Sequence, residues 1–138
     1  MNPGAQSQTL LVGRILLAAI FLVAGSRKLM AVAASAGYLA KLGFPAPEIM
    51  VWVSIVVEIG GALLLILGWH ARRAAWLLAL FTLIATFAAH RFWEPEHAAQ
   101  YANQMNHFLK NLAIVGGMLI IAAVGPGGVS LDARRRSS

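Results

Sequence analysis

The chain has 138 residues, of which 59% are hydrophobic and 12% charged, and it carries a net charge of +6. A soluble domain has about twice this charged fraction, so the composition excludes a water-soluble protein and indicates a membrane protein. The absence of cysteine excludes thiol exchange, cysteine-ligated metal centres and disulfides. The basic residues flank the apolar segments, so we expect anionic lipid headgroups and not nucleic acid as their partner.

Four apolar segments are each long enough to cross a bilayer. A spanning helix needs about 20 apolar residues and lipid tolerates no open sheet edge, so the fold class is all-α, a bundle of four transmembrane helices. Tryptophans near the segment ends are typical of aromatic belts at the two membrane surfaces. The predicted helices, within one domain of residues 1–138, are residues 10–30, 49–67, 74–92 and 107–124.

The connections between these segments are rich in turn-forming residues. Glycine and proline in residues 37–47 predict a loop, and residues 68–73 predict a tight turn. Residues 97–105 are expected to form a short interfacial helix. The tail from Gly125 predicts a helix end followed by the basic run 134–136.

The first apolar segment also has the small residues of a signal-peptide cleavage site at positions 23–26. Arg14 interrupts the segment and no basic cluster precedes it, which favours a retained helix. Four spans put both termini on one side, together with Arg72 and Arg73. The excess of arginine on that side predicts cytoplasmic termini in a bacterial-type inner membrane.

Two ionisable residues lie inside predicted spanning helices, where an isolated charge costs roughly 2.5 to 3.5 kcal/mol. Arg14 is near the start of the first helix and Glu58 near the middle of the second. An arginine side chain can reach across the intervening depth, so we predict that Glu58 is paired with Arg14, with Lys110 as the other possible partner. Arg14 and Lys28 also share one face of the first helix.

A polar cluster is predicted at the outer end of the bundle. Because successive helices alternate in direction, residues from the first, third and fourth helices meet there above Glu58. Intramembrane ionisable groups suggest a functional site, although the same groups can serve only to hold helices together. With Arg14, the predicted site residues are Lys28, Glu58, His90, His107, Lys110 and Asn111.

Several other features have a structural interpretation. Gly60, Gly61, Gly116 and Gly117 are expected to allow close helix packing. The histidines and glutamates around Pro95 match no metal motif in their spacing, so no metal site is predicted.

Short motifs follow one another in order from Leu10 to Asp132: Gly13-Arg14, Phe21, Ala24-Gly25, Lys28-Leu29, Leu42-Gly43-Phe44-Pro45, Glu58-Ile59-Gly60-Gly61, Leu67-Gly68, Arg72, His90-Arg91-Phe92, Asn106-His107-Phe108-Leu109-Lys110-Asn111-Leu112 and Gly125-Pro126-Gly127-Gly128-Val129-Ser130-Leu131-Asp132. This series resembles the DoxX family of small inner-membrane proteins. The resemblance implies a four-helix bundle. It also implies a role in membrane redox or sulfur metabolism, because the family's namesakes resemble subunits of thiosulfate:quinone oxidoreductase.

We therefore expect a redox-associated membrane subunit that binds a quinone-like apolar ligand between its helices, without a covalently bound cofactor. His90 or Lys110 would donate to a quinone oxygen and Glu58 would exchange protons. The sequence identifies no catalytic residue, so at most it predicts a subunit of a quinone-linked oxidoreductase. Two alternatives stay open: a transporter for ions or small solutes, and a non-catalytic scaffold. The partner would be the lipid bilayer, with a homo-oligomer or a membrane complex as further options.

Overall fold

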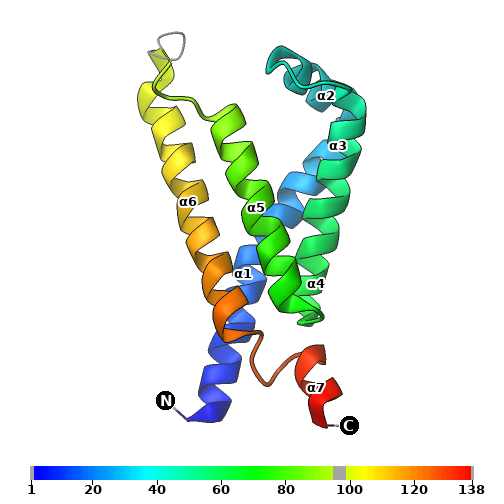
Figure 1. The fold of residues 1–138 in the computed structure, drawn as a ribbon, viewed down its shortest axis with the longest axis vertical. Helices are drawn as coiled ribbons and strands as arrows, with labels where there is room; N and C mark the ends of the chain where they lie inside the picture. Colours follow the sequence, from blue (N-terminus) through cyan, green and yellow to red (C-terminus); the bar gives the residue numbers. More distant parts are fainter. Residues whose placement is uncertain (1, 95–98, 138) are drawn as a thin grey trace.

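The computed structural model describes residues 2–94 and 99–137, and in these ranges it contains helices and no strand (Figure 1). Four helical segments are long and apolar enough to cross a membrane, which confirms the predicted fold class. The second of these segments is continuous through α3, a π-helical turn η1 and α4. The elements are α1 (Pro3–Met30), α2 (Val32–Lys41), α3 (Pro47–Ile55), η1 (Val56–Gly60), α4 (Gly61–Leu67), α5 (Ala71–Ala89), α6 (Tyr101–Val124) and α7 (Leu131–Ser137).

Both chain ends lie at the same end of the bundle, which we call the terminal end (Figure 1). Helix α1 leads away from it to the opposite, distal end, where α2 lies. The segment α3–η1–α4 returns, α5 rises again beside it, and α6 descends to the short helix α7. In the same view, α5 with α6 and α2 with α3 diverge towards the distal end.

The prediction of one loop over residues 37–47 is wrong, because residues 32–41 form helix α2 and only residues 42–46 connect it to α3. The stretch is rich in alanine and contains no proline, so its single glycine does not end the helix. The third spanning helix ends at Ala89 instead of residue 92, since His90 leaves the helical conformation. Of the predicted interfacial helix, 97 and 98 lie outside the described residues, and residues 101–105 belong to α6.

The core lies between α1, α4, α5 and α6. Its completely buried members include Ala18, Leu65, Leu78 and Met118. Membranes provide no hydrophobic force between helices, so close packing has to stabilise this core.

Only two of the four glycines predicted to pack do so closely. A Cβ atom on Gly61 would lie 2.8 Å from Leu78, and one on Gly117 would lie 3.0 Å from Leu17. Gly60 and Gly116 have open space where a Cβ atom would be.

At the terminal end, the tail after α6 folds back onto the helices. The carboxylate of Asp132 accepts hydrogen bonds from the backbone N–H groups of His70 (2.9 Å) and Ala71 (3.0 Å), where α5 begins. The buried Arg14 donates from Nη2 to the carbonyl of Val129 at 2.6 Å. These contacts satisfy two N–H groups at the start of α5 and one nitrogen of Arg14, whose Nε and Nη1 atoms are buried without a partner in the described part of the chain.

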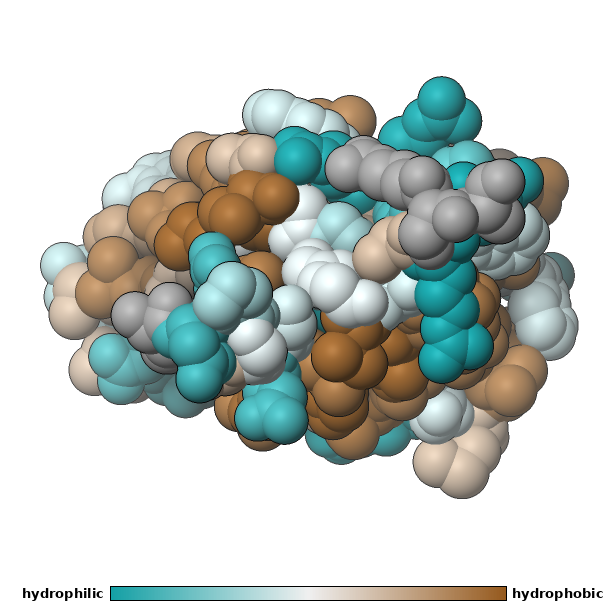
Figure 2. Space-filling view, turned by 90° about the horizontal axis from the view of Figure 1, so that it is seen from below, coloured by the Kyte–Doolittle hydropathy of each residue, from teal (hydrophilic) through white to brown (hydrophobic). Residues whose placement is uncertain are grey.

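The guanidinium of Arg72 completes this arrangement. It donates to the last carbonyls of α6, at Ala122 (2.6 Å), Ala123 (2.5 Å) and Val124 (3.1 Å). A cation at a helix C-terminus also complements the helix dipole. We call the contacts of Arg14, Arg72 and Asp132 the terminal clamp. Figure 2 looks onto this end and shows separate hydrophilic patches with apolar surface between them.

Arg72 and its neighbour Arg73 give a direct test of the terminal clamp. Arg72→Met removes the partners of three α6 carbonyls, so we expect a loss of about 1 to 2 kcal/mol in the free energy of unfolding. Arg73→Met removes an equal charge without these contacts and should have little effect. Thermal unfolding in one detergent measures both, and equal losses for the two variants would contradict the clamp.

Candidate ligand-binding site

An ion pair at the distal half of the bundle joins α1 to the π-helical turn. The Nζ atom of Lys28 lies 2.7 Å from Oε1 and 2.8 Å from Oε2 of Glu58. Glu58 is 4% exposed, whereas the side chain of Lys28 is 31% exposed. Gly25, one turn before Lys28, has no side chain to keep the helices apart, and a Cβ atom there would lie 2.7 Å from Ile59.

Glu58 occupies the middle of η1, the one π-helical turn in the described residues. A π-helical turn accommodates an extra residue, which interrupts the regular register of the helix and often occurs at functional sites. The flanking segments α3 and α4 are regular α-helices. The irregularity is therefore confined to the turn that holds the carboxylate.

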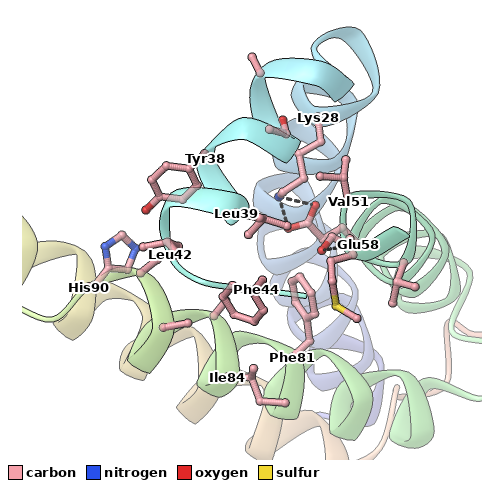
Figure 3. Close-up of a pocket in the computed structure, with 18 residues that line it drawn as sticks. Lys28, Tyr38, Leu39, Leu42, Phe44, Val51, Glu58, Phe81, Ile84 and His90 are labelled. Carbon is pink, nitrogen blue, oxygen red and sulfur yellow. Dashed lines mark hydrogen bonds and ion pairs between the residues drawn. The ribbon is translucent and has the colours of Figure 1, made fainter. Parts of the chain in front are cut away.

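A cavity of about 590 Å³ lies between α2, α3 and α5, with the ion pair in its wall (Figure 3). Most of its lining is apolar, including Leu39, Phe44 and Phe81. Its polar groups come from the Lys28–Glu58 pair, His90, Tyr38 and two serines. This size and composition are typical of sites for small organic ligands.

Part of the cavity rim belongs to the outer surface of the membrane-spanning helices. Met50 and Val53 on α3 and Ile84 on α5 line the cavity and are 36%, 49% and 56% exposed. Both residues of α3 and the one of α5 belong to helical segments long and apolar enough to cross a membrane. The cavity therefore opens on the exposed surface of two spanning helices.

A second cavity, of about 240 Å³, lies on the other side of α5, against α1 and α6. Lys110 and Asn111 of α6 line it, together with Thr82. Glu58, Phe81, Ala85 and His90 line both cavities.

His90 is held where α5 ends. Its Nδ1 atom lies 2.9 Å from Oε1 of Gln104, and its ring stacks on that of His107 with the centroids 5.1 Å apart. The Nζ atom of Lys110 lies 3.3 Å from Nδ1 of His107. These contacts fix the imidazole of His90 at the boundary of the two cavities.

The structure thus brings six of the seven predicted site residues to the distal half of the bundle and places Arg14 at the terminal end. The predicted Arg14–Glu58 pair is wrong, since Arg14 contacts Val129 and Glu58 pairs with Lys28. Lys110 is not the partner of Glu58 either. The six residues around the cavities are Lys28, Glu58, His90, His107, Lys110 and Asn111.

The two threonines of α5 form hydrogen bonds within their own helix. Thr82 and Thr86 are buried, and their hydroxyls donate to the carbonyls of Leu78 and Thr82. Such bonds satisfy the hydroxyl within its own helix. In residues 2–94 and 99–137, no cluster of three metal-binding side chains occurs.

Sequence reasoning missed the aromatic and amide side chains of the site. Tyr38 and Phe44 come from the segment expected to be a loop, and Phe81 was counted only among the apolar residues of a spanning helix. Gln104, the partner of His90, lies in the segment 97–105 that was expected to be a short interfacial helix.

Comparison with known proteins agrees with the fold and with these motifs. The family model for DoxX matches residues 9–91. The chain belongs to the DoxX family. It is 35% identical to the inner membrane protein YphA of Escherichia coli, covering 94% of this chain and 92% of that protein. It is 36% identical to the inner membrane protein YqjF of the same organism, covering 88% of each chain.

A more distant similarity links this DoxX-family protein to a larger one. The Surfeit locus protein 4 homolog of Schizosaccharomyces pombe is 29% identical over 91% of this chain and 37% of its own length. No solved structure matches the chain significantly. The comparisons and the four spans together make this DoxX-family chain an integral membrane protein.

A double-mutant cycle tests the ion pair of this DoxX-family protein. Glu58→Gln leaves the Lys28 cation without a carboxylate, so adding Lys28→Gln should cost less than it does alone. We expect a coupling energy of about 1 kcal/mol, the scale of polar pairs in membranes. Thermal unfolding in one detergent gives the value. Arg14→Gln is the control, because Arg14 and Glu58 share no contact and their effects should add.

Proposed function

We propose that this protein binds a lipid-soluble, quinone-like ligand in the large cavity, as a redox-associated subunit of the inner membrane. One observation carries the proposal: an apolar cavity of about 590 Å³ opens on the exposed surface of two spanning helices and has an ion pair and a histidine in its wall. A ligand that partitions into the bilayer can reach this cavity without crossing water.

The lining fits such a ligand at both ends. A quinone needs an apolar slot for its tail and a hydrogen-bond donor near a carbonyl oxygen. Leu39, Phe44 and Phe81 provide the apolar walls. Since Nδ1 of His90 donates to Oε1 of Gln104, the ring can donate to a ligand from Nε2 when both nitrogens are protonated. Glu58, paired with Lys28, is the group that would exchange a proton with the ligand.

The observations favour ligand binding over permeation. A permeation path would need polar groups along the axis between Arg14 and Glu58. The layer between them is apolar and closely packed, with Ala18, Leu65 and Leu78 completely buried. A scaffold role would need no cavity. Assembly into a homo-oligomer or a membrane complex is compatible with ligand binding and with a scaffold role.

The distribution of arginine supports cytoplasmic termini. Arg72, Arg73, Arg134 and Arg135 belong to segments at the terminal end. We expect a fluorescent protein fused to the C-terminus to be fluorescent in bacterial cells, and alkaline phosphatase at the same place to be inactive. The opposite pair of results would reverse the orientation.

Ligand binding is tested with purified protein in nanodiscs and a benzoquinone that carries a ten-carbon alkyl chain. We expect saturable binding, and His90→Ala should weaken it about fivefold through the loss of one hydrogen bond. Ala88→Trp fills the cavity and should abolish binding. Ala113→Trp, at an exposed position of α6, is the matched control. Absence of saturable binding, or equal binding by both tryptophan variants, would contradict the proposal.

A further inference from the structure

The two cavities are neighbours beside α5. Both are lined by Glu58, Phe81, Ala85 and His90, so these four side chains stand between one cavity and the other. The large cavity lies towards α2 and α3, and the small one towards α1 and α6. A ligand in the large cavity that passes between these side chains would place one end in the small cavity.

Two side chains with hydrogen-bond donors, Lys110 and Asn111, line the small cavity and have few acceptors near them. Lys110 has one neighbour at hydrogen-bonding distance, a histidine nitrogen at 3.3 Å, and no carboxylate within salt-bridge distance in the described residues. The side chain of Asn111 makes no hydrogen bond there either. Lys28 differs, because both oxygens of Glu58 contact its ammonium group. Lys110 is exposed and Asn111 is half-buried, so both donors remain open to an acceptor that enters the cavity.

Among the described residues, the one carboxylate in the wall of the small cavity, Glu58, is already paired with Lys28. The hydroxyl of Thr82 donates to the carbonyl of Leu78, so its oxygen and the amide oxygen of Asn111 are neutral acceptors of this wall. A ligand group entering this cavity therefore meets donors from Lys110 and Asn111 without a free carboxylate beside them. This chemistry selects an oxygen acceptor over a cation.

We propose that the small cavity is a subsite for the oxygen-bearing head of the ligand, and that Lys110 and Asn111 donate to that oxygen. The inference rests on the proposed function, which places the apolar body of the same ligand in the large cavity. The substrate class is thus an amphiphile with a carbonyl, phenol or similar oxygen on its head and an apolar tail. Its head passes Phe81 and Ala85, and its tail runs towards the lipid.

Two probes separate the head from the tail: the benzoquinone with a ten-carbon chain, and a benzene ring with the same chain and no oxygen. Lys110→Met and Asn111→Leu should each weaken quinone binding in nanodiscs, about tenfold for the lysine. Neither variant should change the affinity for the oxygen-free probe. Lys110→Arg keeps a charged donor and should restore most of the quinone affinity. Lys41→Met, at the end of α2 and outside both cavities, is the matched control.

The outcomes distinguish this inference from the proposed function. If the native protein binds the quinone and Lys110→Met binds it equally well, the subsite is wrong and the proposed function stands. Equal weakening of both probes by Lys110→Met would also overturn the subsite, because the effect would not depend on the head oxygens. If the native protein binds neither probe, the proposed function itself fails.

Discussion

A polar group that enters a bilayer must find its partner within the protein, and this requirement shapes both ends of the bundle. At the terminal end, Arg72 contacts the end of α6, Asp132 contacts the start of α5, and Arg14 contacts the tail. These contacts tie α1, α5 and α6 together through their backbone groups. The terminal clamp thereby fixes the positions from which the helices extend.

The distal end is held differently. Lys28 and Glu58 join α1 to η1, and His90 joins the end of α5 to Gln104 of α6. In the described part of the chain, no hydrogen bond connects α5 to α2 or α3. The space between these helices is the large cavity, so the cavity exists because the helices are held together at the terminal end and diverge at the distal end.

The candidate site could be predicted in part from helix direction alone. Alternating spans bring Lys28, His90 and Lys110 to one end whatever the details of packing, and the structure has them there. The partner of Glu58 could not be predicted in this way. Arg14 and Lys28 share a face of α1, so the sequence does not show which of them contacts Glu58. Gly25 has no side chain and lets η1 approach α1 one turn before Lys28, which brings Glu58 to Lys28.

The sequence by itself determined the class of protein, the number of spanning helices and the family, because hydrophobic length and short motifs are local properties. It also placed the charged residues inside the spans. Only the tertiary structure decided that residues 32–41 form a helix, that Glu58 pairs with Lys28, and that His90 lines two neighbouring cavities. These features depend on the distances between helices, and side-chain packing from all of the helices sets those distances together.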